Sequence, residues 1–157
     1  MLVQTVAWID SAVECPPVAA RDFSFRAKKS PVVHVLVVDD EPLVRWSVAE
    51  TLGAGGFQVI EAGSGESAIV AVMSAPGATD VVLLDLVLPD FRDLSLLAVL
   101  RRLAPAVPII MMTAFATPEL VERARKLGAF TVLNKPFEMN ELAPLIRTAL
   151  LATRPGG

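Results

Sequence analysis

The chain contains 157 residues, of which 54% are hydrophobic, and its net charge at pH 7 is −3. This length suits one domain with residues to spare, and the negative charge gives no reason to expect direct contact with nucleic acid or with a membrane surface. No segment approaches the roughly 20 uninterrupted apolar residues of a membrane span, and the single Cys15 excludes an internal disulfide and favours a cytoplasmic protein.

The first 30 residues do not share the regular pattern of the rest of the chain, and the prolines that follow Cys15 stop any regular element there. We predict that residues 1–30 form an N-terminal extension. This extension is either disordered or pinned to the domain surface by its aromatic residues, Trp8, Phe23 and Phe25. Residues 31–152 then form the domain, and residues 153–157 form a C-terminal tail.

From residue 31 onward, short apolar runs alternate with stretches of helical periodicity. Prolines 42 and 118 suit first helical turns, Ser64 and Thr117 suit helix caps, and Gly128 suits a helix end. In chain order we predict strand 32–38, helix 42–54, strand 57–62, helix 65–74, strand 80–84, helix 94–103, strand 107–112, helix 118–127, strand 130–134 and helix 138–152. Five alternations with short connections predict an α/β protein whose parallel sheet has right-handed crossovers and helices on both faces.

Polar residues follow several of the predicted strands. They are Asp39, Asp40, Asp85, Thr113 and Lys135. Ligand sites in open parallel sheets lie beyond the carboxyl ends of the strands, so we expect these side chains to converge. Taken alone, Asp85 could merely open a turn before a proline, but the other four polar residues at strand ends favour a functional site.

Three clustered carboxylates repel one another unless a cation lies among them. Oxygen ligands suit Mg²⁺, which leaves coordination positions for phosphate oxygens. Asp85 would then act as a nucleophile that accepts a phosphoryl group, while Lys135 and Thr113 contact phosphate oxygens. The sequence therefore predicts a site for Mg²⁺ and a phosphoryl group.

Four motifs in this order resemble those of response-regulator receiver domains in two-component signalling. They are VVDDE at 37–41, DLVLPD at 85–90, MTA at 112–114 and KPF at 135–137. The resemblance covers about residues 31–151. It implies a flavodoxin-like (βα)5 fold, which is a doubly wound parallel sheet with strand order 2-1-3-4-5.

The resemblance also implies residue roles. Asp85 would be phosphorylated by a histidine kinase, and Asp40 and Asp85 would coordinate Mg²⁺ together with the backbone carbonyl of Val87. Asp39 would assist through water, whereas Thr113 and Lys135 would sense the phosphoryl group. A cis peptide bond often precedes the proline that follows this lysine.

Partners implied by the resemblance are a sensor histidine kinase or phosphotransfer protein and a downstream effector protein or output domain. The surface of the fourth helix, fifth strand and last helix is a candidate for partner contacts and for a homodimer. Such a domain is a signalling phosphoacceptor that takes part in its own phosphotransfer and dephosphorylation, rather than an enzyme.

Two positions depart from the receiver pattern. Val132 lies three residues before the lysine, where receivers usually carry Tyr or Phe as a mobile switch, and Asp93 replaces a usual glycine. Asp tolerates a left-handed backbone better than most residues, so we expect the loop to survive this replacement, with an added negative charge nearby. These departures leave open a phosphorylation-independent binding module. An aspartyl phosphatase of the haloacid-dehalogenase type is disfavoured because Val87 stands where its second aspartate is needed.

Overall fold

The computed structural model describes residues 31–153, and the predictions for residues 1–30 and 154–157 lie outside this part of the chain. Every predicted strand and helix is confirmed to within two residues. The elements are β1 (His34–Val38), α1 (Pro42–Ala54), β2 (Gln58–Ala62), α2 (Gly65–Ser74), β3 (Val81–Asp85), α3 (Ser95–Leu103), β4 (Ile109–Thr113), α4 (Pro118–Lys126), β5 (Thr131–Asn134) and α5 (Met139–Thr153). The last helix thus ends at the first residue of the predicted tail.

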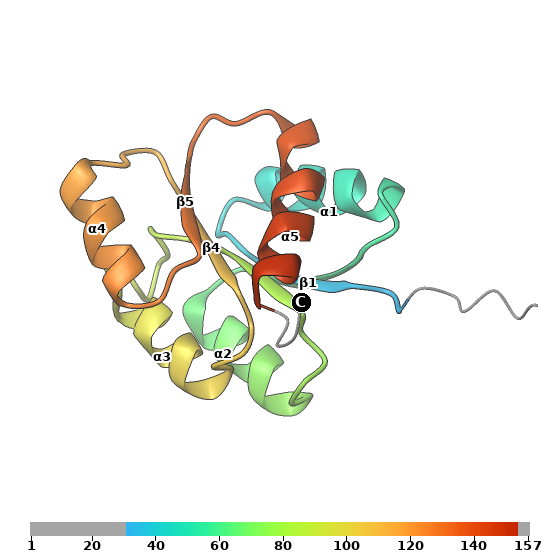
Figure 1. The fold of residues 1–157 in the computed structure, drawn as a ribbon, viewed down its shortest axis with the longest axis horizontal. Coiled ribbons are helices and arrows are strands. Elements are labelled where there is room, and N and C mark those ends of the chain that lie inside the picture. The colour runs from blue at the N-terminus through green and yellow to red at the C-terminus, as the bar shows by residue number, and fades with distance from the viewer. Residues whose placement is uncertain (1–30, 154–157) are drawn as a thin grey trace, which may run out of the picture.

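The strands form one parallel sheet in the order β2-β1-β3-β4-β5, which confirms the flavodoxin-like topology. Figure 1 shows the sheet between two layers of helices. Helices α1 and α5 cover one face, and α2, α3 and α4 cover the other. None of these helices, within residues 31–153, is both long enough and apolar enough to cross a membrane.

Local sequence signals fix where two of the helices begin. The side chains of Ser64 and Ser67 form a capping box at the start of α2. Thr117 caps α4 by accepting a hydrogen bond from the backbone N–H of Leu120 at 3.2 Å. Gly128 ends the α4 region with a backbone φ of +98°, a conformation that favours glycine.

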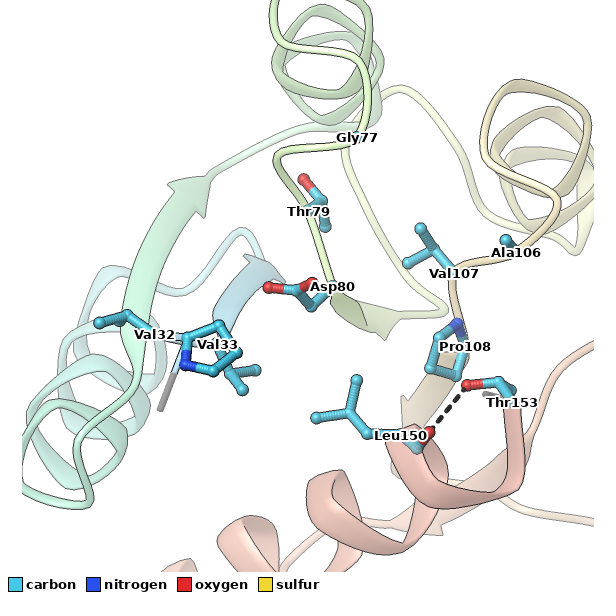
Figure 2. Close-up of a pocket in the computed structure, with 11 residues that line it drawn as sticks. Val32, Val33, Gly77, Thr79, Asp80, Ala106, Val107, Pro108, Leu150 and Thr153 are labelled. Carbon is cyan, nitrogen blue, oxygen red and sulfur yellow. Dashed lines mark hydrogen bonds between the residues drawn. The ribbon is translucent and has the colours of Figure 1, made fainter. Parts of the chain in front are cut away.

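The amino-terminal edge of the sheet holds a largely apolar groove of about 340 Å³ (Figure 2). Its walls come from the segments that lead into β1, β3 and β4 and from the end of α5. Lining residues include Val33, Asp80, Pro108, Leu150 and Thr153. The groove therefore lies at the opposite edge from the polar residues singled out in the sequence.

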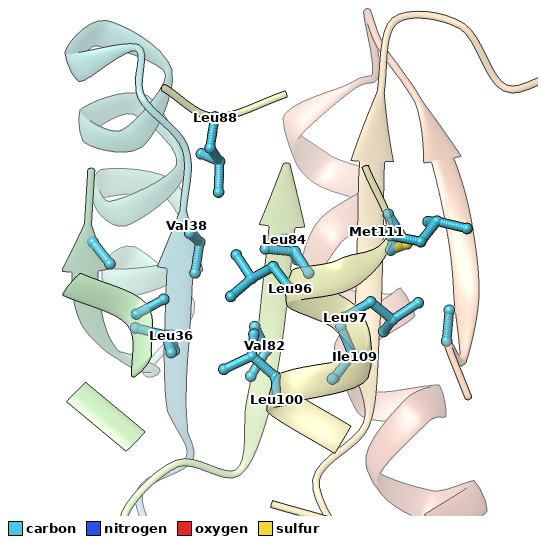
Figure 3. Close-up of a cluster of buried hydrophobic side chains, with 14 of the residues drawn as sticks. Leu36, Val38, Val82, Leu84, Leu88, Leu96, Leu97, Leu100, Ile109 and Met111 are labelled. Atoms are coloured by element: carbon cyan, nitrogen blue, oxygen red, sulfur yellow. The ribbon is translucent and has the colours of Figure 1, made fainter. Parts of the chain in front are cut away.

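Two separate hydrophobic cores flank the sheet because successive strand residues point to opposite faces. In β1, Leu36 and Val38 pack on the side of α2, α3 and α4, whereas Val35 and Val37 pack on the side of α1 and α5. Figure 3 shows the first of these cores, in which side chains of α3 lie over β1, β3 and β4. Burial on both faces explains the nearly continuous apolar strands.

Candidate functional site

Three aspartates meet at the carboxyl edge of the sheet. Asp39 directly follows β1, Asp40 comes next, and Asp85 is the last residue of β3. One oxygen from each carboxylate lies within 4.8 Å of the other two. Asp39 and Asp85 are buried, whereas Asp40 is exposed. The predicted convergence of the three carboxylates is therefore confirmed.

Lys135 brings a positive charge into this cluster from the end of β5. Its Nζ lies 2.7 Å from Oδ2 of Asp39 and 3.2 Å from Oδ2 of Asp85, and only 18% of its side chain is exposed. The following peptide bond, Lys135–Pro136, is cis. One ammonium group thus compensates two buried carboxylates.

Burial and charge together shift the protonation of these groups. Burial raises the pKa of Asp85 above its ordinary value; the charge of Lys135 opposes this shift and that of Asp39 reinforces it. Burial alone would lower the pKa of Lys135, but the hydrogen bond to Asp39 and the two carboxylate charges outweigh it and raise this pKa. The lysine therefore stays charged, and a further cation nearby would favour the ionised form of Asp85.

Thr113 is the last residue of β4 and is buried. Its Oγ1 accepts a hydrogen bond from the backbone N–H of Phe115 at 3.2 Å, and its carbonyl accepts one from the N–H of Lys135 at 2.7 Å. In the sheet register Asp85 pairs with Met112, the neighbour of Thr113. The threonine thus lies at the same edge as the carboxylates.

The donor set of this site suits a hard divalent cation. Each of the three carboxylates offers an oxygen, and Mg²⁺ typically takes one or two carboxylates and keeps further positions for water and phosphate. Val87 lies in the loop that follows Asp85, and its N–H donates to Oδ1 of that residue at 3.4 Å. A role of its carbonyl as a metal ligand stays a prediction.

Comparison with known proteins decides the family. The family model described as the response regulator receiver domain matches residues 35–147, which is most of the chain and includes the whole acidic cluster. The chain belongs to the response regulator receiver family. The receiver identity predicted from the four motifs is thereby confirmed, and with it membership in two-component systems.

Curated relatives and a solved structure agree with this result. The transcriptional regulatory protein PdtaR of Mycobacterium tuberculosis is 38% identical over 121 residues, or 74% of this chain and 56% of that protein. The probable transcriptional regulatory protein TcrX of the same species is 37% identical, covering 82% and 53%. A receiver domain crystal structure from Clostridium thermocellum has a TM-score of 0.72 and 25% identity, covering 77% and 96%. The chain thus spans about half the length of these curated relatives.

The two departures from the receiver pattern have different outcomes. Val132 is partly buried and packs against the core on the side of α2, α3 and α4. The left-handed backbone considered for Asp93 is not found, because no residue other than glycine has a positive φ in residues 31–153. Asp93 instead accepts hydrogen bonds from the backbone N–H and the hydroxyl of Ser95, at the start of α3. Asp93 therefore accepts the first N–H of α3 without a left-handed backbone.

The loop after Asp85 contains contacts that the sequence analysis missed. The Asp90 carboxylate accepts hydrogen bonds from the backbone N–H groups of Gly65 and Glu66 at 2.9 and 2.8 Å, across 25 and 24 residues. Burial alone would raise the pKa of Asp90, but these N–H groups outweigh it and hold the pKa below its usual value. The Phe91 ring occupies the space that a side chain at position 65 would need. The loop after Asp85 is thus tied to α2.

Proposed function

We propose that this receiver domain accepts a phosphoryl group on Asp85 in a Mg²⁺-dependent reaction and thereby switches protein interactions in a phosphorelay. The observation that carries this proposal is the convergence of Asp39, Asp40 and Asp85 around one lysine at the carboxyl edge. Three carboxylates and one ammonium leave surplus negative charge, which a divalent cation would neutralise before a phosphate could approach.

The chemistry follows from the positions of the side chains. A carboxylate oxygen of Asp85 forms a bond to phosphorus while the bond from phosphorus to the donor atom breaks, and the donor keeps the electron pair. Lys135 lies 3.2 Å from this carboxylate and is placed to contact a phosphoryl oxygen. The Thr113 hydroxyl accepts a hydrogen bond from Phe115 and still has a proton to donate.

The metal would be held by Asp40 and Asp85 with the carbonyl of Val87, while Asp39 would act through water. When bound, Mg²⁺ supplies positive charge that offsets the charge of the transferred group. The domain would also take part in its own dephosphorylation. Because the kinase reaction depends on ATP, the proposal places the domain in the cytoplasm.

The proposed phosphoryl donor is a sensor histidine kinase or a phosphotransfer protein. Exposed apolar side chains stand on the segments that carry the site: Leu43 in the first turn of α1, Val87 after β3 and Phe115 after β4. Apolar side chains exposed together around a polar site are typical of protein contact surfaces. The downstream partner is an effector protein or an output domain, and the surface of α4, β5 and α5 is the proposed homodimer face.

Phosphorylation by acetyl phosphate tests the proposal directly. Intact-mass spectrometry should detect one added phosphoryl group on the wild-type protein only when Mg²⁺ is present. Asp85→Asn should abolish the addition. The matched control is Asp80→Asn. This aspartate directly precedes β3, whereas Asp85 ends it, and the variant should be labelled as wild type is. Equal labelling of Asp85→Asn and wild type would refute the proposal.

A second candidate function rests on Val132. A valine cannot undergo the aromatic rotation by which receivers usually transmit phosphorylation, so the domain would serve as a phosphorylation-independent binding module. The complete set of Asp39, Asp40, Asp85 and Lys135 weighs against this alternative. Absence of labelling in a folded wild-type protein would favour it.

A further inference from the structure

Arg45 lies behind the acidic cluster, in the second turn of α1. Its Nη1 donates a 2.6 Å hydrogen bond to the backbone carbonyl of Asp39, and its Nε lies 3.5 Å from Oε2 of Glu61 in β2. The guanidinium also lies over Gly63, where an added Cβ would be 3.3 Å from Nη1. Only 19% of the side chain is exposed. One side chain therefore joins α1, the end of β1 and the end of β2.

The hydrogen bond from Arg45 acts on the peptide unit between two of the aspartates. A peptide unit is planar, so fixing the Asp39 carbonyl oxygen also fixes the N and Cα of Asp40. The remaining groups of Asp39 are held as well. Its N–H donates to Ala62 O at 3.1 Å, its Oδ1 accepts from the Glu41 N–H at 2.9 Å, and its Oδ2 contacts Lys135. Asp40 is exposed, so the region that its carboxylate can reach is set by where the backbone places its Cα.

We propose that Arg45 is a positioning residue for the metal site, which orients the Asp40 carboxylate by anchoring the Asp39 carbonyl. The inference rests on the proposed function, since it concerns the same cation. Arg45 acts on the metal ligand Asp40 through the single peptide unit that joins Asp39 to Asp40. Groups that orient metal ligands typically contribute about 10- to 100-fold to metal affinity. We place the effect of Arg45 at about tenfold, because it acts on the backbone.

Electrostatics alone makes the opposite prediction. The guanidinium is a positive charge near a site for a divalent cation, and its removal would strengthen Mg²⁺ binding if only Coulomb repulsion mattered. Loss of the anchor would instead weaken binding, because Asp40 would lose its fixed direction. The sign of the change therefore separates positioning from simple charge repulsion.

The experiment is a Mg²⁺ titration followed by backbone amide NMR spectra, which measures the dissociation constant without any phosphoryl transfer. Arg45→Gln should raise the dissociation constant about tenfold. Arg45→Lys keeps the charge but lacks the planar fork needed to reach Asp39 and Glu61 together, so it should give an intermediate rise. The control is Arg147→Gln, which removes a positive charge that stacks on Phe57 in the segment before β2.

A second measurement needs no metal. In EDTA, hydrogen exchange of the Asp40 amide should be faster in Arg45→Gln than in wild type and unchanged in Arg147→Gln. An unchanged or lower Mg²⁺ dissociation constant in a folded Arg45→Gln or Arg45→Lys protein would overturn the inference. If wild type itself shows no Mg²⁺-dependent shifts, the proposed function fails together with the role of Arg45. If wild type binds Mg²⁺ and is phosphorylated but Arg45→Gln binds Mg²⁺ equally well, only the role of Arg45 fails.

Discussion

The two edges of the sheet both carry acidic side chains, but they differ in how those charges are compensated. At the amino-terminal edge, Asp80 accepts the backbone N–H of His34 at 2.8 Å, and its side chain is 42% exposed beside an apolar groove. At the carboxyl edge, Asp39 and Asp85 are buried and share one lysine. The first carboxylate is exposed and has a backbone partner, whereas the second pair is buried and shares one positive charge.

This contrast teaches that a cavity and a carboxylate do not by themselves make a functional site. Among residues 31–153, apolar side chains make up most of the lining of the groove in Figure 2, and the aspartate beside them, Asp80, has a hydrogen-bond partner of its own. The carboxyl edge gathers more negative charge than its lysine can neutralise. A divalent cation would neutralise this surplus negative charge, which is why the proposed function lies at the carboxyl edge.

The largest expected effect comes from removing the cation of the carboxyl edge. Lys135→Met leaves the Asp39 and Asp85 carboxylates facing each other with little solvent. We expect the free energy of unfolding at pH 7 to fall by about 3 kcal/mol in the absence of Mg²⁺, and by less when Mg²⁺ is added. Urea unfolding in EDTA and in Mg²⁺ measures both values.

The counterpart at the amino-terminal edge is His34→Gln. It removes the imidazole that lies 3.5 Å from Asp80 but keeps the backbone N–H that donates to this carboxylate. The expected loss is below about 1 kcal/mol, as for other exposed pairs. Equal losses from Lys135→Met and His34→Gln would erase the difference between the two edges.

An intermediate effect is expected from tight packing beside the acidic cluster. Gly65→Ala places a Cβ where the Phe91 ring now lies, so the ring must move and the free energy of unfolding should fall by about 2 kcal/mol. Gly53→Ala is the matched control, since its Cβ would meet nothing within 4 Å in α1 and should stabilise the protein by about 0.5–1 kcal/mol. Thermal unfolding of both variants should give changes of opposite sign.

The smallest expected effect is the pH dependence of Asp85. Its pKa in the folded protein is raised above the ordinary value of 3.8, so ionisation costs stability at every pH above the folded pKa. Asp85→Asn should therefore be more stable than wild type at pH 7 without Mg²⁺. The advantage should shrink as pH falls through the raised pKa towards 3.8. A less stable variant at pH 7 would mean that attraction to Lys135 outweighs burial.

Much of the fold was readable from the sequence because its signals are local. Apolar runs bounded by prolines, glycines and hydroxyl caps gave all the strands and helices within residues 31–153. Strand order came from the resemblance to receivers rather than from periodicity. Short-range patterns contain no information on which strands are neighbours, whereas family motifs do.

The site was predictable to the extent that its residues end strands. Asp39, Asp85 and Thr113 stand at the carboxyl ends of β1, β3 and β4, and parallel topology brings such ends to one edge. Arg45 was not predictable, because its contacts with Asp39 and Glu61 depend on how α1 packs on the sheet. The backbone at Asp93 was not predictable either, because the loop reaches α3 without any left-handed residue there.

Burial of the strands on both faces has a consequence for how the chain finds its register during folding. Val35 and Leu36 pack in different cores, yet both are apolar. A shift of β1 by one residue would therefore move each side chain to the other core without exposing a hydrophobic side chain. If the shift moves each residue one place toward the amino-terminal edge, however, it draws Asp39 after β1 or Asp85 of β3 deeper between the two cores, at a cost of several kcal/mol. The acidic residues at the strand ends therefore restrict pairing errors, and their replacement by apolar residues should broaden the set of misfolded states.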